Sequence, residues 1–256
     1  MQNIRTKKQF GQHFLKDEDI ARRIAGSLQL QHLYKHVLEI GPGMGMLSQF
    51  LLENKGPEIH LIEIDTEAVE YLQKKFPAHQ AQIISGDFLR LELDTLFPGP
   101  FAVIGNFPYN ISSQILFKVL DYKDRIPEVV GMFQKEVAER IASGPGNRDY
   151  GILSVLMQAF YDVELLFSLN EDDFSPPPKV KSAVLRFVRR DDHILKCDPK
   201  RFLNVVKTAF NQRRKTLRNA LKGISQGKDL PYLDLRAEAL HWTQFEELTL
   251  LLEKQK

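Results

Sequence analysis

Short apolar runs alternate with segments of helical periodicity through residue 160. Short apolar runs indicate buried strands, whereas apolar positions three and four residues apart indicate amphipathic helices. Strands that alternate with helices are typical of a parallel sheet covered on both faces. The predicted strands are 37–40, 59–64, 82–84, 101–104 and 128–133, and the predicted helices are 46–52, 66–76, 112–120, 135–142 and 150–160. Thr66 is the expected N-cap of its helix.

The pattern changes in the last hundred residues. Two late strands are predicted at 161–167 and 181–189. Between them lies Ser-Pro-Pro-Pro-Lys-Val at 175–180, which cannot form regular structure because proline lacks the N–H donor. Beyond residue 190 the chain is predicted to be helical throughout 199–222 and mostly helical over 235–253. We therefore expect an α/β, Rossmann-like domain over 1–190 and a small all-helical domain over 191–256.

Composition narrows the class of protein. The chain has 256 residues, of which 43% are apolar, enough for a large core and one small appended domain. A single cysteine, Cys197, cannot form an internal disulfide. The basic N-terminus is not followed by the apolar stretch of a secretory signal, and no run approaches the roughly 20 apolar residues of a membrane helix. We expect a cytoplasmic protein without membrane association, and nothing suggests more than a monomer.

The first candidate site follows the strand at 37–40, in Glu39-Ile-Gly-Pro-Gly-Met-Gly45. Glycines permit a sharp turn and close approach of a ligand to the main chain, and the following helix presents free N–H groups. A glycine cluster by itself is equally compatible with a plain turn. The spacing is G-x-G-x-G rather than the G-x-G-x-x-G of dinucleotide sites, which favours a methyl-donor cofactor over NAD.

Two acidic residues extend this candidate site. Glu63 ends the next strand, about 20 residues on, where doubly wound folds place an acid that holds ribose hydroxyls. Asp87 and Phe88 follow the third strand. Asp87 can accept a hydrogen bond from an adenine amine while Phe88 packs on the ring, although this segment alone is also compatible with a solvated turn. All these positions fall at the carboxyl edge of one sheet, where such folds bind ligands.

The strand at 101–104 runs directly into Asn106-Phe-Pro-Tyr109. The lone pair of an aromatic amine is delocalised into the ring, so two acceptors that grip its N–H bonds make it more nucleophilic. The Asn106 oxygen and a main-chain carbonyl near Phe107–Pro108 can supply these acceptors, and Tyr109 can stack on the base. No strong general base is needed. The target must be flipped out or single-stranded, since an adenine within a duplex cannot reach such a loop.

Basic residues gather in the expected helical domain. No acidic residue occurs between Asp198 and Asp229. A basic helix alone is often only a solvated face, but a whole segment without acids fits a phosphate backbone better. The expected RNA contacts are Lys207, Arg213, Arg214, Lys215, Arg218 and Lys222, with Lys7 and Lys8 from the N-terminal arm. No Cys/His cluster has metal-ligand spacing, so no metal is expected.

Several motifs occur together along the chain. They are the segments 8–15, 39–45, 62–65, 86–87, 106–109, 174–182 and 209–217. With this combination the chain resembles the small-subunit (16S) ribosomal RNA adenine dimethyltransferases of the KsgA type over nearly its whole length. Many members of that family have Asn in place of His13 and Leu in place of Phe107.

The resemblance implies transfer of methyl groups from S-adenosyl-L-methionine, which leaves S-adenosyl-L-homocysteine. It implies N6-dimethylation of two adjacent adenosines in the loop of the 3′-terminal hairpin of 16S rRNA, within an immature small ribosomal subunit. It further implies cofactor contacts from His13, Leu15, Gly41, Glu63, Asp87 and Asn106, to which the residue pattern adds Gly43 and Phe88.

Two other functions remain open. A 23S rRNA adenine methyltransferase of the macrolide-resistance type shares the cofactor site and the Asn-x-Pro-Tyr-type loop. The proline-rich loop and the Asn-Gln-Arg-Arg-Lys segment at 211–215 favour the small-subunit enzyme. A ribosome assembly factor that acts mainly by binding is the alternative from another class, and the intact loop at 106–109 argues against lost catalysis.

Overall fold

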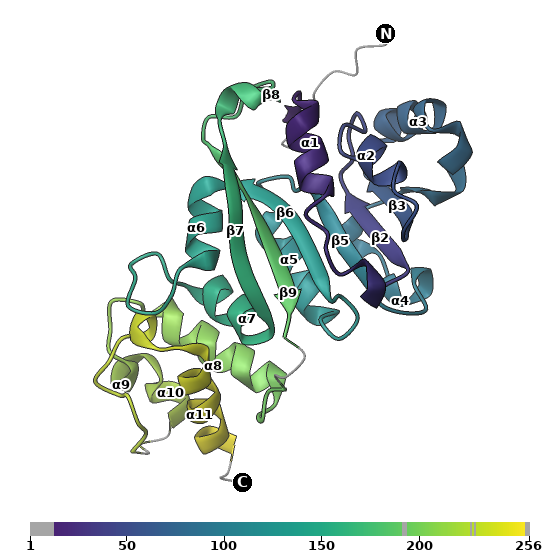
Figure 1. Ribbon diagram of the computed structural model, residues 1–256. Coiled ribbons are helices and arrows are strands. Elements are labelled where there is room, and N and C mark those ends of the chain that lie inside the picture. Colours follow the sequence, from purple (N-terminus) through teal and green to yellow (C-terminus); the bar gives the residue numbers. More distant parts are fainter. Residues whose placement is uncertain (1–12, 191–193, 226, 228, 254–256) are drawn as a thin grey trace. The chain divides into compact units, whose positions relative to one another are not determined.

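The computed structural model describes residues 13–190, 194–225, 227 and 229–253 (Figure 1). The chain divides into two compact units. The first holds the described residues up to Ala138 and Glu164–Arg189, and the second holds Glu139–Val163 and the described residues from Arg190 on. The second unit is therefore discontinuous in sequence, unlike the expected domain 191–256. The reason is that α7 (Ile152–Phe160) contacts α8 (Pro199–Asn211) and α11 (Trp242–Glu253).

A seven-stranded sheet forms the centre of the α/β fold, in the order β4-β3-β2-β5-β6-β9-β7. The five strands from β4 to β6 in this order are parallel to their neighbours, and β9 is antiparallel to β6. The predicted Rossmann-like, mainly parallel sheet is confirmed. The strands are β2 (His36–Ile40), β3 (Glu58–Glu63), β4 (Ile83–Ser85), β5 (Phe101–Asn106), β6 (Glu128–Gln134), β7 (Tyr161–Leu169) and β9 (Ser182–Arg189).

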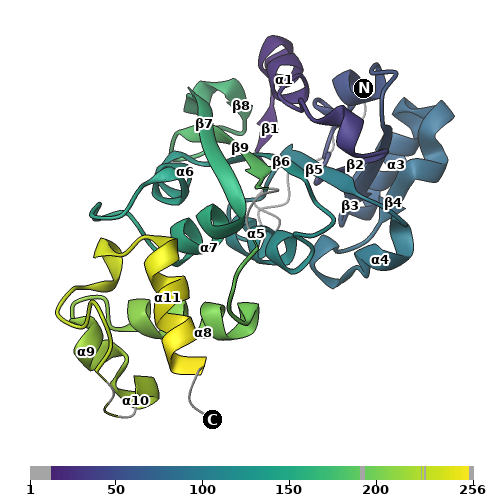
Figure 2. The same ribbon diagram turned by 60° about the horizontal axis from the view of Figure 1, so that its bottom comes forward.

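Helices cover both faces of this sheet. Buried side chains of α1, α2 and α3 share one apolar cluster with the strands, and Figures 1 and 2 show α5 on the face opposite α1. The helices are α1 (Glu18–Ala25), α2 (Ser48–Leu52), α3 (Thr66–Lys75), α4 (Leu93–Leu96), α5 (Ser112–Asp121) and α6 (Lys135–Ala142). Short 3₁₀ turns occur at Gln31–Leu33, Pro77–Gln82, Phe88–Arg90 and Glu171–Asp173.

Local capping explains two differences from the predicted helices. The N-cap of α3 is Asp65, whose carboxylate accepts a bond from the Glu67 N–H, so the expected Thr66 cap is wrong. Asp17 likewise caps α1, which the sequence pattern did not predict, and accepts from the Asp19 and Ile20 N–H groups. In both cases the carboxylate satisfies helix N–H groups that lack intrahelical partners.

A two-stranded ladder joins distant parts of the first unit. In it β1 (Phe14–Leu15) pairs antiparallel with β8 (Phe174–Ser175). The Lys16 N–H extends the ladder by a 2.9 Å bond to the Asp173 carbonyl. The segment before α1 is thus bound to the start of the proline-rich loop, which begins with a cis Ser175–Pro176 peptide.

The second unit is helical, but the expected continuous helix over 199–222 is wrong. The helix α8 ends at Asn211, and Thr216 instead forms a β-bridge with Arg236 while the Leu217 N–H donates to the Leu235 carbonyl. This tertiary pairing takes the N–H groups that a continuing helix would use. The chain then forms α9 (Leu217–Ala220), α10 (Lys222–Ser225), a 3₁₀ turn at Ala237–Ala239 and α11. In the described residues, no helix is long and apolar enough to cross a membrane.

Candidate active site

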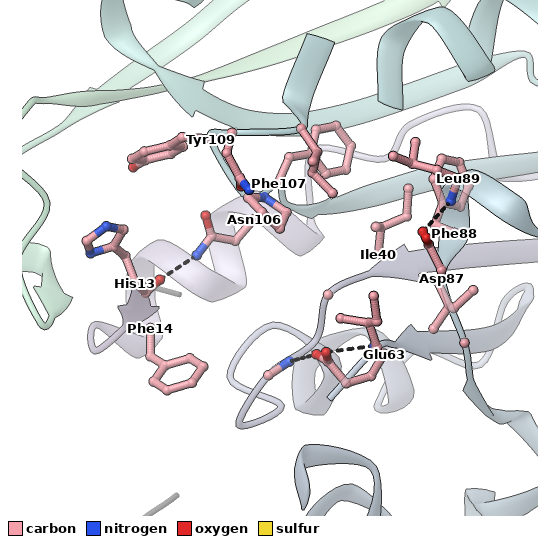
Figure 3. A pocket seen from close by; sticks show the side chains of 18 residues that line it. His13, Phe14, Ile40, Glu63, Asp87, Phe88, Leu89, Asn106, Phe107 and Tyr109 are labelled. Atoms are coloured by element: carbon pink, nitrogen blue, oxygen red, sulfur yellow. Dashed lines mark hydrogen bonds between the residues drawn. The ribbon is translucent and has the colours of Figure 1, made fainter. Parts of the chain in front are cut away.

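A cavity of about 260 Å³ opens at the carboxyl ends of β2, β3, β4 and β5 (Figure 3). The predicted positions at four separate strand ends meet there, as the parallel sheet requires. The predicted residues that line it are His13, Gly41, Gly43, Glu63, Asp87, Phe88, Asn106, Phe107, Pro108 and Tyr109. The lining residues that the sequence reasoning missed are Phe14, Ile40, Ile62, Ile64, Gly86, Leu89, Asn110 and Ile111.

The glycine loop turns through left-handed backbone. Gly41 and Gly43 have φ values of 67° and 55°, which side chains rarely adopt. A Cβ atom on Gly43 would also lie 2.6 Å from the Phe14 ring, so the loop passes directly against this aromatic side chain. The conformation and the contact both require glycine.

The Glu63 carboxylate holds this loop from the next strand. Its Oε2 accepts from the Gly43 N–H at 3.0 Å, and its Oε1 accepts from the Ile64 N–H at 2.8 Å (Figure 3). Oε1 also accepts from the Asp65 N–H at 2.9 Å. The pKa of Glu63 is raised, because the effect of burial exceeds the opposite effect of the backbone N–H donors, which lower it. A carboxylate offers about four acceptor positions. One position on Oε2 therefore remains for a ligand hydroxyl.

Glu39 lies behind the glycine loop and is 1% exposed. Burial raises the pKa of its carboxyl to about 8. Its Oε2 has no hydrogen-bond partner within the described part of the chain. Glu39 therefore binds a proton in the folded protein at a pH where it would be ionised in the unfolded chain.

The pKa of Glu39 predicts a loss of stability with rising pH. The folded pKa of about 8 exceeds the ordinary 4.5, so this contribution is complete below about pH 4.5 and disappears as the pH rises through 8. Relative to Glu39→Gln, the wild type should lose on the order of 3 kcal/mol between about pH 5.5 and 8. Urea denaturation of both proteins at the two pH values measures this difference. Parallel pH profiles would contradict it.

The segment after β4 is fixed from two sides. Asp87 Oδ1 caps the following turn by accepting from the Leu89 N–H at 2.9 Å, and Lys118 donates to the Phe88 and Leu91 carbonyls at 2.6 and 2.5 Å. Phe88 lines the cavity but is only 4% exposed. Asp87 Oδ2 forms a 3.5 Å ion pair with the exposed Arg90 and retains acceptor capacity.

The side chain of Asn106 has a defined orientation. Its Nδ2 donates to the His13 carbonyl at 2.8 Å. Because a carbonyl accepts only from the NH₂ end of the amide, Oδ1 lies on the other side, and Figure 3 shows it directed toward Tyr109. The amide oxygen is thus available as an acceptor at the cavity.

The rest of the Asn106–Tyr109 loop divides into buried and ligand-facing parts. The Phe107 side chain is fully buried against Phe133, and a Cβ atom on Gly131 would lie 2.4 Å from its ring. Phe107 can therefore contribute only main-chain atoms to the site. Tyr109 is fixed by a 2.5 Å hydrogen bond to the Ser182 hydroxyl, and burial raises its pKa.

His13 connects this loop to the proline-rich segment. Its Nδ1 lies 2.9 Å from the Pro176 carbonyl, and its ring stacks on Tyr109 at 5.7 Å between centroids. The carbonyl can only accept, so Nδ1 carries a proton and donates it in this bond. The adjacent Leu15, expected to contact cofactor, is buried in the core cluster and does not line the cavity.

The His13 contacts predict that Asn is a mild replacement. His13→Asn keeps the main-chain carbonyl that holds Asn106, and its amide can still donate to Pro176. We expect kcat/KM to remain within about threefold, whereas His13→Ala, which loses the donor, should fall about fivefold or more. Steady-state methylation assays of both variants test this. Equal losses in the two variants would contradict the role of the Pro176 bond.

The basic residues of the second unit differ in their surroundings. Arg213 donates to the Arg148 and Tyr150 carbonyls and pairs with Glu238, while Arg218 pairs with Asp234 at 2.9 Å. Glu238 and Asp234 thus supply negative charges to the segment between Asp198 and Asp229, which contains no acidic residue of its own. Among the expected RNA contacts, Lys207, Arg214, Lys215, Arg218 and Lys222 are exposed, and Lys7 and Lys8 lie outside the described residues.

Comparisons with known proteins extend over nearly the whole chain. The model of the ribosomal RNA adenine dimethylase family matches residues 3–240. A ribosomal RNA small subunit methyltransferase A of Parabacteroides distasonis is 59% identical over 259 residues, covering 99% of this chain and 96% of that protein. Two solved structures share the fold.

The first solved structure is a dimethyladenosine transferase from Plasmodium falciparum, with a TM-score of 0.78 and 24% identity over 94% of this chain and 98% of that chain. The second is the 23S rRNA methyltransferase ErmE, with a TM-score of 0.63 and 27% identity over 92% of this chain and 99% of that chain. Full-length identity is thus much higher to the small-subunit relative than to the 23S enzyme.

Proposed function

The chain belongs to the ribosomal RNA adenine dimethylase family, and we propose that it dimethylates N6 of two adjacent adenosines in the loop of the 3′-terminal hairpin of 16S rRNA. It is an S-adenosylmethionine-dependent methyltransferase. Its proposed substrate is the RNA within an immature small ribosomal subunit, on which it acts as a cytoplasmic monomer. The oriented Asn106 amide at the cavity is the observation that carries the proposed chemistry.

The residues of the cavity fit the methyl donor. S-Adenosylmethionine supplies a methyl group on a positively charged sulfur, which makes that carbon a strong electrophile. Glu63 has one acceptor position for a ribose hydroxyl, and Asp87 Oδ2 can accept from the adenine amine of the donor. Gly41 and Gly43 allow close approach to the main chain. His13 and Asn106 complete the proposed donor contacts.

The Asn106–Tyr109 loop is proposed to bind the target adenine. The Asn106 Oδ1 and the carbonyl of Phe107 or Pro108 accept hydrogen bonds from the N–H groups of the amine, which draws its lone pair out of conjugation. Tyr109, held by Ser182, stacks on the ring and sets its plane. The N6 proton leaves to solvent after transfer. Catalysis rests on positioning and on preorganised acceptors.

RNA binding is proposed for the basic second unit and the N-terminal arm. Exposed Lys207, Arg214, Lys215 and Lys222 carry this role together with Lys7 and Lys8. Arg213 and Arg218 are proposed to bind phosphate while also bridging segments of the unit.

Mapping the product tests this function. Small subunits from a strain without the activity are incubated with the protein and radiolabelled S-adenosylmethionine. The label should appear on N6 of two adjacent adenosines in the terminal hairpin of 16S rRNA. Label on 23S rRNA would establish the rival macrolide-resistance activity. Absence of label from both RNAs, with intact donor binding, would overturn the proposed substrate.

A further inference from the structure

Three potential metal ligands meet at the edge of the sheet opposite the cofactor cavity. They are His36 Nδ1, His60 Nε2 and Glu58 Oε2. The two nitrogens are 3.2 Å apart, and the carboxylate oxygen lies 3.4 Å from His36 and 3.6 Å from His60. Each atom therefore faces the other two, and a single hydrogen bond cannot satisfy all three.

Strand pairing creates this arrangement. His36 and Glu58 are the first residues of β2 and β3, and the parallel register places them opposite each other. His60 lies two residues beyond Glu58, on the same face of the sheet. His36 lies more than 20 positions before Glu58 and His60 in sequence, which is why the spacing gave no metal motif and no metal was expected.

The separations match a tetrahedral site. With metal–ligand bonds of about 2.0–2.1 Å and tetrahedral angles, ligand atoms lie about 3.3–3.4 Å apart. We propose that His36, Glu58 and His60 bind one Zn²⁺ ion. Two imidazoles and a carboxylate are a donor set that zinc accepts, and a water molecule would complete the coordination.

Neighbouring residues support the ligands. Gln82 Nε2 donates to Glu58 Oε1 at 3.1 Å and thereby leaves Oε2 directed at the two imidazoles. The Phe97 ring packs against both histidines, at 5.5 and 5.0 Å between centroids. Glu58 is 48% exposed, so an ion can enter from solvent. Orienting bonds and an apolar flank of this kind strengthen metal sites.

The position of the site indicates its effect. A bound ion would link the amino ends of β2 and β3, whereas the glycine loop and Glu63 lie at their carboxyl ends. Zinc is therefore proposed to stabilise the sheet without taking part in methyl transfer.

Isothermal titration of untagged, chelator-treated full-length protein with ZnCl₂ tests the proposal. The wild type should bind one equivalent and unfold at a higher temperature with zinc. Glu58→Ala and His60→Gln should each weaken binding by more than about a hundredfold, and Gln82→Ala by about tenfold. Because Glu58 is exposed, its variant should fold even where the His60 variant is destabilised.

His32 provides a matched control, since it is exposed and lines the same surface hollow as His36. His32→Ala should bind zinc as tightly as the wild type. Absence of binding, or binding that survives in Glu58→Ala and His60→Gln, would overturn the site. Affinity for S-adenosylhomocysteine, measured in the same samples, should be independent of zinc.

Discussion

Asn106→Ala is expected to lower kcat for adenine methylation by about 10²–10³-fold or more while the protein still binds S-adenosylhomocysteine. The substitution removes the amide oxygen proposed to accept a hydrogen bond from the N6–H of the target adenine. It also removes the hydrogen bond to the His13 carbonyl. Glu63 and Asp87, which are proposed to hold the methyl donor, remain in place. Single-turnover methylation and calorimetry on the same preparation measure the two effects.

Asn110→Ala is the matched control for this prediction. Asn110 has an exposed side chain and lines the same cavity, but it stands outside the Asn106–Tyr109 loop. Its variant should lose far less activity. Wild-type turnover in Asn106→Ala, or an equal loss in both variants, would remove Asn106 from the proposed chemistry.

Glu63→Ala is expected to weaken binding of the methyl donor by about 100-fold and to destabilise the protein by roughly 3–5 kcal/mol. Three backbone N–H groups lose their acceptor, and these include the Gly43 N–H that shapes the glycine loop. The ribose hydroxyl loses its proposed partner at the same time. Calorimetric titration and urea denaturation separate the two effects.

Two further variants sharpen this test. Glu63→Gln keeps an oxygen for Ile64 and Asp65 but presents NH₂ to the Gly43 N–H, so its affinity should fall while most of the stability remains. Glu70→Ala changes an exposed acid on α3 and should alter neither quantity. Unchanged donor affinity in Glu63→Ala would refute the ribose contact.

The sheet could be predicted from the sequence because each strand is indicated by residues that are neighbours in the chain. Apolar runs and the turns after them determine the strands, and in a parallel sheet all carboxyl ends share one edge. Glu63, Asp87 and Asn106 could therefore be assigned to one site without coordinates.

Features that depend on pairing between distant segments could not be predicted. The break after α8 results from the Thr216–Arg236 bridge. The partners of Arg213 include Arg148 and Glu238, and the partner of Arg218 is Asp234, all distant in sequence. Phe14 enters the cavity because β1 pairs with β8, so a segment at the start of the chain contacts the glycine loop. No local pattern carries this information.

The β1–β8 ladder also sets how heat affects the enzyme. It holds the His13 carbonyl, and hence the Asn106 amide, through two residue pairs and the Lys16–Asp173 bond, whereas β2 and β3 are joined by five residue pairs. Short ladders open at lower free energy than the sheets to which they attach. Methyl transfer should consequently cease on warming before the central fold melts, so that the operating limit of this enzyme is a local opening and not its melting temperature.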